Sequence, residues 1–292
     1  MKVLVTGAFG QLGSEVVDCF RHRGHVVIAP PKQDLNMLRP DQIRQAVIGH
    51  KPDWVINCAA WTQVDNAETE AATVFRVNRD GAECLAQAVA RSGGRLLHVS
   101  TDYVFDGQQR RPYRETDATA PQSVYGRSKL AGEQAVLAAL PDAIVLRTAW
   151  VYGVRGRNFV KTMLRLAAAG QELRVVNDQT GTPTSAADIA QAIAALTGCD
   201  TSGVFHFTAA GETTWYGFAV AILEEARRIG FRVRTESVLP ISTAEYPVAA
   251  TRPAYSVLDT TRIQACLDGP VPDWRYSLRI MLKELYTCAD CW

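Results

Sequence analysis

Residues 3–13 read VLVTGAFGQLG, an apolar run followed at once by three glycines. Gly7, Gly10 and Gly13 have the spacing G-x-x-G-x-x-G, and apolar residues recur at helical spacing from Leu12 onward. Such a turn ends a strand and opens a helix, whose free N–H groups and dipole attract a pyrophosphate. Glycine lets the backbone turn tightly and approach the phosphates. The pattern predicts a dinucleotide-binding loop, and the alternative is a strand–helix turn with a purely structural role.

Strand and helix signals alternate through the first half of the chain. Apolar strand runs at 3–5, 26–29, 54–56, 96–99 and 143–146 are separated by helical patterns at 10–23, 40–49, 67–90 and 123–140. This alternation predicts an α/β protein with a doubly wound parallel sheet, a Rossmann fold. The pattern loosens near residue 152, where the only composition shift lies. We expect a dinucleotide-binding domain at 1–151 and a smaller α/β lobe, mainly substrate-binding, at 152–292, some segments of which could return to the first domain.

The composition of the 292 residues excludes several classes of protein. Hydrophobic residues make up 47% and charged residues 21%, as in an ordered globular enzyme. The net charge of +1 gives no electrostatic reason to expect nucleic acid or a membrane surface as partner. No run of 18 apolar residues and no signal peptide is evident. Seven scattered cysteines favour reduced thiols and the cytoplasm, and we expect Cys288-x-x-Cys291 to be a reduced tail.

The stretch 125–129, YGRSK, gives the pattern Y-x-x-x-K. On a helix these two positions share one face, so the phenol of Tyr125 and the ammonium of Lys129 can serve one site. A free tyrosine has a pKa near ~10, and a nearby cation lowers that value. Tyrosine then becomes a usable general acid for a carbonyl oxygen that receives hydride. The alternative is an exposed Tyr/Lys pair on a surface helix, with no catalytic role.

Ser100-Thr101-Asp102 follows the strand run at 96–99. Ligands bind at the carboxyl ends of the strands in open α/β sheets, so Thr101 could donate a hydrogen bond to the same carbonyl oxygen. A turn or N-cap role for Thr101 or Asp102 is the alternative.

The residue after the second strand normally separates NAD from NADP, because an acid there binds the ribose 2′-OH of NAD. This chain has Pro30-Pro31-Lys32 at that place. The lysine favours the 2′-phosphate of NADPH. Asp34 is a substitute for the missing acid, so NADH stays open.

With these residues in place, the chain resembles the extended short-chain dehydrogenase/reductases, and among them the dTDP-4-dehydrorhamnose reductase family. The resemblance runs nearly end to end. It rests on VTGAFGQLG (5–13), INCAAWTQVDNAE (56–68), VN (77–78), HVSTDYVFDG (98–107), PQSVYGRSKLAGE (121–133), LRTAWVYG (146–153), RNFVKTMLRLA (157–167), VVNDQTGTPT (175–184) and TRPAYSVLD (251–259). The STDYVFDG and NDQTGTPT strings are far more specific than the glycine loop.

The resemblance implies roles for individual residues. Catalysis is expected from Thr101, Tyr125 and Lys129. Cofactor binding is expected from Gly7, Gly10, Gln11, Leu12, Gly13, Asp34, Leu35, Ala60, Trp61, Thr62, Tyr125 and Lys129, and substrate binding from Thr101, Asp102, Trp150 and Arg252. Some members also use Mg²⁺ at a dimer interface through acidic side chains. Glu15 could match one ligand, but no glutamate matches near Ala187-Asp188, so a metal and a homodimer both stay open.

The activity implied is an oxidoreductase reaction on a small-molecule nucleotide sugar. NADPH or NADH would reduce the C4 ketone of dTDP-4-dehydro-6-deoxy-L-mannose to give dTDP-L-rhamnose, a precursor of cell-surface polysaccharide. A reductase or epimerase of another nucleotide 4-keto sugar is one alternative, since the same triad serves all of these. A non-catalytic regulatory subunit that senses NADP is another, and a turnover assay separates it from the enzymes.

Overall fold

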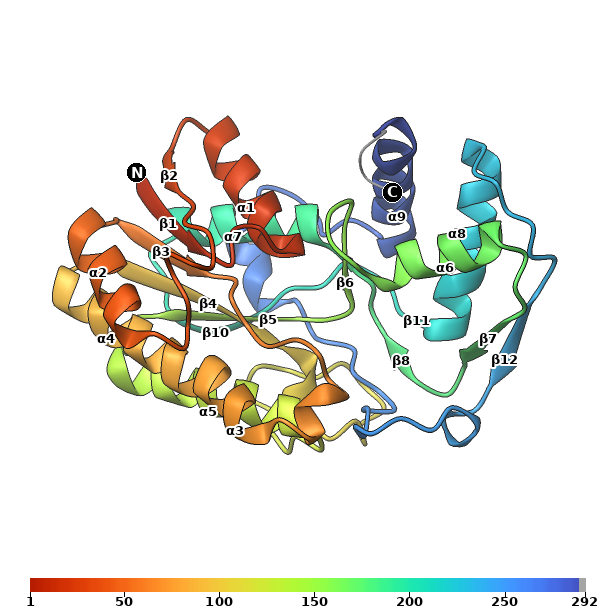
Figure 1. Cartoon of the computed structure of the whole chain (residues 1–292), viewed down its shortest axis with the longest axis horizontal. Helices are drawn as coiled ribbons and strands as arrows, with labels where there is room; N and C mark the ends of the chain where they lie inside the picture. Colours follow the sequence, from red (N-terminus) through yellow and green to blue (C-terminus); the bar gives the residue numbers. More distant parts are fainter. Residues whose placement is uncertain (289–292) are drawn as a thin grey trace.

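A six-stranded sheet organises the computed structural model, which describes residues 1–288 (Figure 1). All neighbouring strands run parallel, in the order β10-β5-β4-β3-β1-β2. The strands are β1 (Lys2–Thr6), β2 (Val26–Ile28), β3 (Trp54–Asn57), β4 (Arg95–Thr101), β5 (Ile144–Thr148) and β10 (Gly203–His206). The chain starts at β1, adds β2 on one side and β3 on the other. The order therefore reverses between β1 and β3, where the carboxyl ends of open α/β sheets bind ligands, and the predicted Rossmann fold is confirmed.

Helices cover both faces of this sheet (Figure 1). One face carries α1 (Gln11–His22) and α7 (Ala186–Gly198), and the other carries α2 (Pro40–His50), α4 (Ala82–Ser92) and α5 (Val124–Ala139). Successive strand residues point to opposite faces, so Val3 and Val5 join the core under α1 whereas Leu4 joins the core under α4. Within residues 1–288 no helix combines the length and apolarity needed to cross a membrane.

The region 67–90, expected as one helix, is divided into several pieces. Short α3 (Ala71–Phe75) leads into a six-residue π-helix, Arg76–Gly81, before α4 begins. The wider turn brings Asn78 against two other segments: its Nδ2 donates to Ser128 Oγ (2.9 Å), and its Oδ1 accepts from the Trp61 N–H (2.8 Å). The expected helical region is therefore confirmed over most of its length, with an interruption at 69–70 and a π-helix in place of an α-helix at 76–81.

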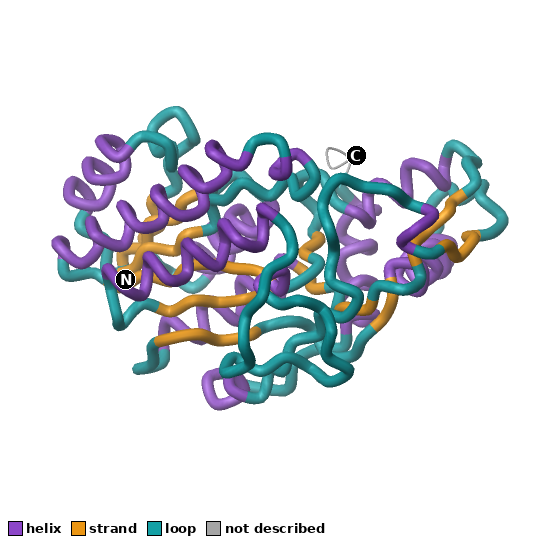
Figure 2. The backbone as a smooth tube through the Cα atoms, turned by 90° about the horizontal axis from the view of Figure 1, so that it is seen from below, coloured by secondary structure: helices purple, strands orange, loops and turns teal. Residues whose placement is uncertain are grey.

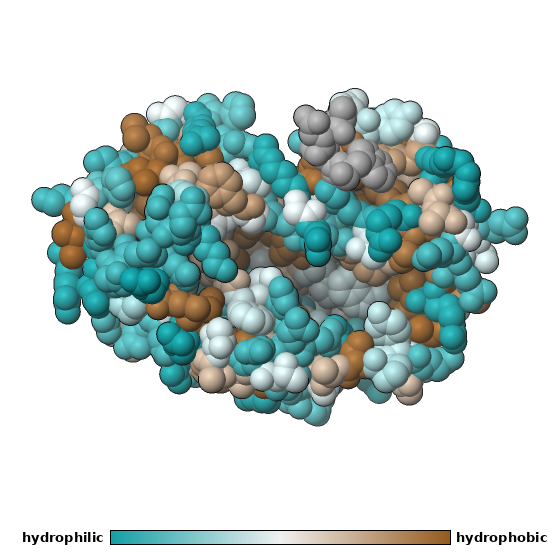
Figure 3. Space-filling view, in the orientation of Figure 1, coloured by the Kyte–Doolittle hydropathy of each residue, from teal (hydrophilic) through white to brown (hydrophobic). Residues whose placement is uncertain are grey.

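A second lobe lies beyond the carboxyl ends of the strands (Figure 1). It packs α6 (Phe159–Ala168), α8 (Trp215–Ile229) and α9 (Trp274–Thr287) with a parallel pair, β7 (Leu173–Val176) and β12 (Val238–Ile241). Two further short pairs join β6 (Val151–Tyr152) to β9 (Thr184–Ser185) and β8 (Thr180–Gly181) to β11 (Thr213–Thr214). Long loops cross the region between the sheet and this lobe (Figure 2), and the surface is hollowed there (Figure 3).

The segment 186–206 returns from the second half of the chain to the sheet. Helix α7 packs on α1, and β10 extends the sheet by pairing with β5. The sheet therefore contains residues from both sides of the expected boundary at 151/152. We propose that the cofactor binds mainly to residues 1–151 and the substrate mainly to residues 152–292.

The described cysteines differ in whether their sulfur atoms are free thiols or form a disulfide bond. Five are free thiols: Cys19, Cys58, Cys84, Cys199 and Cys266. Cys288 is disulfide-bonded, so the expected reduced state of this residue was wrong. Cys291, the other member of the expected tail motif, lies outside the described residues.

Polar side chains form a buried row across the face that α5 covers. Thr6, Asn57 and His98 stand side by side on β1, β3 and β4, and Arg147 stands beside His206 on β5 and β10. All five are at most 4% exposed. Buried polar groups must find hydrogen-bond or ion-pair partners within the protein. Because α5 covers this row, its side chains have to provide some of these partners.

Glu133 of α5 supplies the partner for Arg147. The guanidinium Nη2 lies 2.7 Å from Oε2 and Nε lies 3.0 Å from Oε1, and Ser100 Oγ donates to the same carboxylate. Both side chains of the ion pair are at most 5% exposed. The pair anchors α5 to the sheet one helical turn beyond Lys129.

Replacing Glu133 by glutamine should leave the buried Arg147 cation without its counter-ion. Losing one partner of a buried pair costs about 3–5 kcal/mol, so we expect a loss of that size in the free energy of unfolding from urea denaturation. Asp41→Asn is the matched control, because it removes an exposed ion pair with Arg39 (60% and 63% exposed) and should change little. Equal losses in the two variants would contradict the anchoring role.

Candidate active site

The glycine loop between β1 and α1 has the geometry of an anion site. Gly7 has φ +63°, and a Cβ there would lie 2.8 Å from Ala59 N. A Cβ on Gly13 would lie 2.1 Å from Gly7 O, so both positions need glycine. Gly10 is the N-cap of α1, and no side chain caps the helix or places an acid in its first turn. Its N-terminal N–H groups and dipole therefore fit the diphosphate of a dinucleotide.

The other residues expected around the cofactor follow neighbouring strands. Ala60, Trp61 and Thr62 come after β3, beside the glycine loop. After β2, Asp34 is exposed whereas Leu35 is buried in the core, which leaves only the backbone of Leu35 to face a ligand. Gln11 at the start of α1 accepts a hydrogen bond from Asn158 Nδ2 (2.9 Å), which links the loop to the second lobe.

Helix α5 is placed by its N-terminal contacts and by close approach to the sheet. Ser123 caps the helix by accepting from the Gly126 N–H (3.1 Å), and Glu68 accepts from the Val124 N–H (2.8 Å). A Cβ on Gly126 would lie 2.3 Å from Tyr103 O, and one on Gly132 would lie 2.1 Å from Asn78 O. The first turn of α5 therefore stands directly beside the residues that follow β4.

Thr101, Asp102 and Tyr125 meet at this point. Thr101 Oγ1 donates to Asp102 Oδ1 (3.0 Å) and accepts from the Tyr103 N–H (3.2 Å). Asp102 is 2% exposed, and its Oδ2 has no hydrogen-bond partner among the described residues. Burial raises the pKa of Asp102 to about 6, while the side chains of Ser256 and Thr101 lower it. Burial also raises the pKa of Tyr125 to about 12, while a hydrogen bond with Thr101 lowers it.

Lys129 lies under the site and differs from expectation in what it contacts. The side chain is 2% exposed, its Nζ donates to Val99 O (2.7 Å) and lies 3.3 Å from His98 Nε2. Burial lowers its pKa to about 8. The sequence predicts that this cation lowers the pKa of Tyr125, but the pKa of the phenol is raised, because burial dominates and Nζ is bonded to β4 instead.

Trp150 occupies a strained position at the edge of the second lobe. Its φ of 45° is rare for a residue with a side chain. The indole stacks on Trp215 with ring centroids 3.6 Å apart, and a Cβ on Gly181 would lie 2.5 Å from the ring. Backbone strain of this kind persists where packing on all sides enforces it, commonly at functional sites.

Arg252 is already paired in this structure. Its guanidinium forms two hydrogen bonds with Asp65 (2.7 and 3.1 Å), on the loop that follows β3. A substrate phosphate would have to displace or share this carboxylate, so the geometry leaves the expected role of Arg252 as a proposal.

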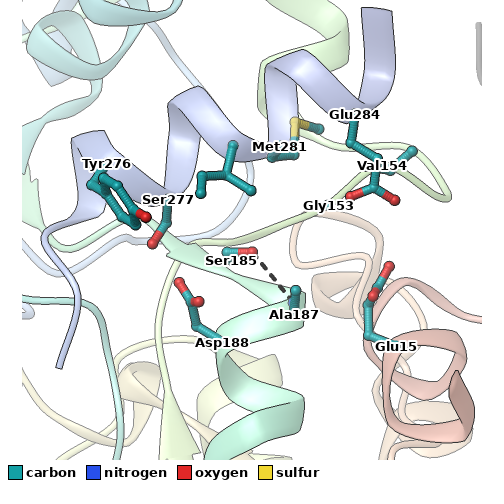
Figure 4. Close-up of a pocket in the computed structure, with 11 residues that line it drawn as sticks. Glu15, Gly153, Val154, Ser185, Ala187, Asp188, Tyr276, Ser277, Met281 and Glu284 are labelled. Carbon is teal, nitrogen blue, oxygen red and sulfur yellow. Dashed lines mark hydrogen bonds between the residues drawn. The ribbon is translucent and has the colours of Figure 1, made fainter. Parts of the chain in front are cut away.

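The residues considered for a metal line a separate pocket between α1, α7 and α9 (Figure 4). Glu15, Asp188 and Glu284 contribute carboxyl groups to it. Burial raises the pKa of both Glu15 and Asp188. Across residues 1–288, no group of three or more His, Cys, Asp or Glu side chains is arranged to hold a metal ion. The donor set of the chain by itself therefore does not fit a metal centre.

No role was expected from the sequence for four buried residues that hold the site residues in place: Asn57, Asn78, His98 and Glu133. The available signal was a break in apolar character: His98 and Ser100 alternate with Leu97 and Val99 on β4, which indicates a strand with one polar interior face. Such polar positions in a buried strand need partners, but the pattern does not name them.

Comparison with known proteins shows the family to which the chain belongs. The family model described as the RmlD substrate binding domain matches residues 1–287. A dTDP-4-dehydrorhamnose reductase from Burkholderia thailandensis is 43% identical over 98% of this chain and 99% of the relative. A probable dTDP-4,6-dihydroxy-2-methyloxan-3-one 4-ketoreductase from Streptomyces antibioticus is 44% identical over 98% and 96%.

A solved structure is similar over the same length. The dTDP-4-dehydrorhamnose reductase from Bacillus anthracis, in complex with NADP, superimposes with a TM-score of 0.92 at 36% identity, covering 97% of this chain and 99% of that one. Sequence and structure agree along the whole described chain, and it belongs to the RmlD substrate binding domain family.

Proposed function

We propose that this chain is an NAD(P)H-dependent dTDP-4-dehydrorhamnose reductase, which reduces the C4 ketone of dTDP-4-dehydro-6-deoxy-L-mannose to give dTDP-L-rhamnose. The observation that carries the reaction type is the meeting of Thr101, Asp102 and Tyr125 at the carboxyl end of β4, above Lys129 and two strands from the glycine loop. The names of full-length relatives support the choice of sugar. Lys32 and the NADP complex of a similar structure favour NADPH.

In this proposal the bound dinucleotide, held at Gly7–Gly13 and along 60–62, supplies the hydride to C4. The protein's part is to position the ketone and to deliver a proton. Thr101 would donate a hydrogen bond to the ketone oxygen by turning its hydroxyl proton away from Asp102 Oδ1. As negative charge develops there, the O–H bond of Tyr125 breaks and a new O–H bond forms on the substrate. Tyr125 is left as phenolate. Its raised pKa makes the phenol a weaker acid, so the transfer depends on the strong basicity of the alkoxide that forms on the substrate, and the phenolate is then readily reprotonated.

Asp102 and Trp150 are proposed to contact the sugar. The unpartnered Oδ2 of Asp102 is a buried acceptor beside the catalytic hydroxyl groups, where a sugar hydroxyl would satisfy it. Trp150 presents a flat apolar ring fixed by Trp215. Arg252 would bind the diphosphate by sharing its bond with Asp65.

A second candidate is a reductase of another dTDP-linked 4-keto sugar, which the Streptomyces antibioticus relative favours. The catalytic residues would be the same. Oxidation of NADPH and NADH measured with a panel of dTDP-linked 4-keto sugars decides between them, and absence of turnover with every sugar and either cofactor would overturn both.

Tyr125→Phe removes the proton donor and preserves the ring. We expect turnover with the 4-keto sugar to fall by about 10²–10⁴-fold, the usual contribution of a general acid. Cofactor affinity, measured by fluorescence titration, should change much less. Tyr113→Phe is the matched control, since it removes another phenolic hydroxyl, bonded to Asp106 at 2.7 Å, and should keep turnover. Full turnover in Tyr125→Phe would rule out the proposed proton donor.

Asp102 should make the protein lose stability as pH rises. Its folded-state pKa of about 6 exceeds the ~4 of an unfolded chain, so folding favours the protonated acid. The cost is absent below about pH 4 and reaches up to about 3 kcal/mol above about pH 6. The free energy of unfolding of the native chain, minus that of Asp102→Asn, should therefore fall across this window in urea titrations.

Asp106→Asn provides a control of opposite sign. Hydrogen bonds from the Gln108 N–H and the Tyr113 hydroxyl hold the pKa of Asp106 below its usual value. Its contribution should therefore appear as pH rises and be lost as pH falls. A pH-independent difference for Asp102→Asn would show that folding does not change the pKa of Asp102, and would contradict the expected rise.

A further inference from the structure

A chain of hydrogen bonds crosses three strands and ends at Lys129. Thr6 Oγ1 on β1 donates to Asn57 Oδ1 (2.6 Å) on β3. Asn57 Nδ2 lies 2.8 Å from His98 Nδ1 on β4, and His98 Nε2 lies 3.3 Å from Lys129 Nζ. These four residues are at most 2% exposed, so water does not complete their hydrogen bonds.

The orientation of the Asn57 amide fixes which nitrogen of His98 carries the proton. The Ala59 N–H, which can only donate, lies 3.3 Å from Asn57 Oδ1. Turning the amide around would set Nδ2 against that N–H, donor to donor. Asn57 therefore presents Nδ2 to His98, whose Nδ1 must accept, and a neutral imidazole then carries its proton on Nε2. His98 is neutral because burial and the neighbouring Lys129 hold its pKa well below the usual value.

We propose that His98 is a positioning residue for Lys129: held with its proton on Nε2 by Thr6 and Asn57, it directs an N–H at Nζ and so favours the uncharged amine. An ammonium group has three donors and no acceptor, so it meets this N–H unfavourably, whereas the amine lone pair accepts from it. The Nζ retains its own donor bond to Val99 O in either state. The catalytic meaning of this control rests on the proposed reductase function; the tautomer and the titration of Lys129 do not.

The other groups around Lys129 pull in the opposite direction. Glu133 on the same helix and Cys58 after β3 both favour the ammonium form. Glu133, however, is held in a bidentate pair with Arg147, and burial raises the pKa of the Cys58 thiol to about 12, so the thiol is neutral. Tyr125 is neutral as well. Besides the Val99 carbonyl, His98 is therefore the polar group in direct contact with Nζ, and in the proposal it acts in the same direction as burial, which lowers the pKa of Lys129.

Two nuclear magnetic resonance measurements on the full chain without substrate test the proposal. In protein labelled with ¹⁵N-histidine, the His98 ring, assigned by its loss in His98→Phe, should show a protonated Nε2 and a bare Nδ1. In protein labelled with ¹³Cε-lysine, the Lys129 signal is assigned by its loss in Lys129→Met. We expect His98→Phe to raise the titration midpoint of Lys129 by about one pH unit.

The direction in which the Lys129 midpoint shifts decides whether His98 Nε2 donates to Nζ or accepts from it. If His98 Nε2 accepted from the ammonium, removing the imidazole would lower the midpoint, so a downward shift overturns the proposal. An unchanged midpoint, or a proton on Nδ1, overturns it too.

A matched pair of mild substitutions covers the case in which His98→Phe does not fold. Thr6→Val removes the shorter of the two hydrogen bonds that hold Asn57 Oδ1 and leaves the one from the Ala59 N–H, so the Nε2–H tautomer of His98 should become less dominant, with a smaller upward shift for Lys129. Thr197→Val removes another buried hydroxyl, bonded to Ala194 O on α7, and should change neither signal. An unchanged tautomer and midpoint in Thr6→Val would overturn the part of the proposal that assigns the position of the His98 proton to Thr6.

The reductase assay is the separate readout. In turnover with the 4-keto sugar, the pH profile of His98→Phe should move in the same direction as the Lys129 midpoint, and an unmoved profile would overturn the catalytic meaning of the control. Failure of every sugar to react, with the resonance shifts as expected, would overturn the proposed function and leave the inference about Lys129 intact.

Discussion

The need to satisfy a row of buried polar groups beneath α5 determines where this helix, which carries Tyr125 and Lys129, lies. Arg147 would be an uncompensated charge in the core without Glu133, and such a charge costs several kcal/mol. The ion pair fixes the middle of α5, while Gly126 and Gly132 let the helix backbone approach within contact of Tyr103 and Asn78. Tyr125 and Lys129 lie on the same helix between these constraints, so their positions follow from the packing below the site.

Another buried polar residue, Asn78, accounts for the irregular helical region before α4. Asn78 must reach both the Trp61 backbone and Ser128 of α5, and a regular α-helix through 76–81 would carry its side chain elsewhere. The backbone hydrogen bonds of the π-helix are poorer than those of an α-helix, and the side-chain contacts of Asn78 compensate for this loss. Because Trp61 follows β3 beside the glycine loop, this single irregularity ties the expected cofactor segment to the catalytic helix.

Local sequence signals predicted the features that depend on near neighbours. The apolar run and glycines of 3–13, the parallel alternation and the pairing of Tyr125 with Lys129 on one helix face all come from spacing within a few residues. Contacts across long separations had no such signal: β10 joins the sheet from residue 203, Asp65 pairs with Arg252, and His98 meets Asn57. For the same reason the pattern Y-x-x-x-K placed Lys129 on the correct face but not at Val99 and His98, which only the strand order brings beneath it.

Several polar contacts join the first 151 residues to the rest of the chain. Gln11 bonds Asn158 at the start of α1, Arg155 bonds Asp18 on the same helix, and Arg252 bonds Asp65 after β3. Of these three bonds, the one from Arg252 involves a residue proposed to bind substrate. An anionic substrate that binds Arg252 would replace the existing ion pair with Asp65. Its net gain in binding free energy is therefore the difference between two similar interactions, and not the full strength of one. Affinity at such a site has to come largely from groups that are unsatisfied before binding, and Asp102 Oδ2 and the uncapped N-terminus of α1 are of that kind.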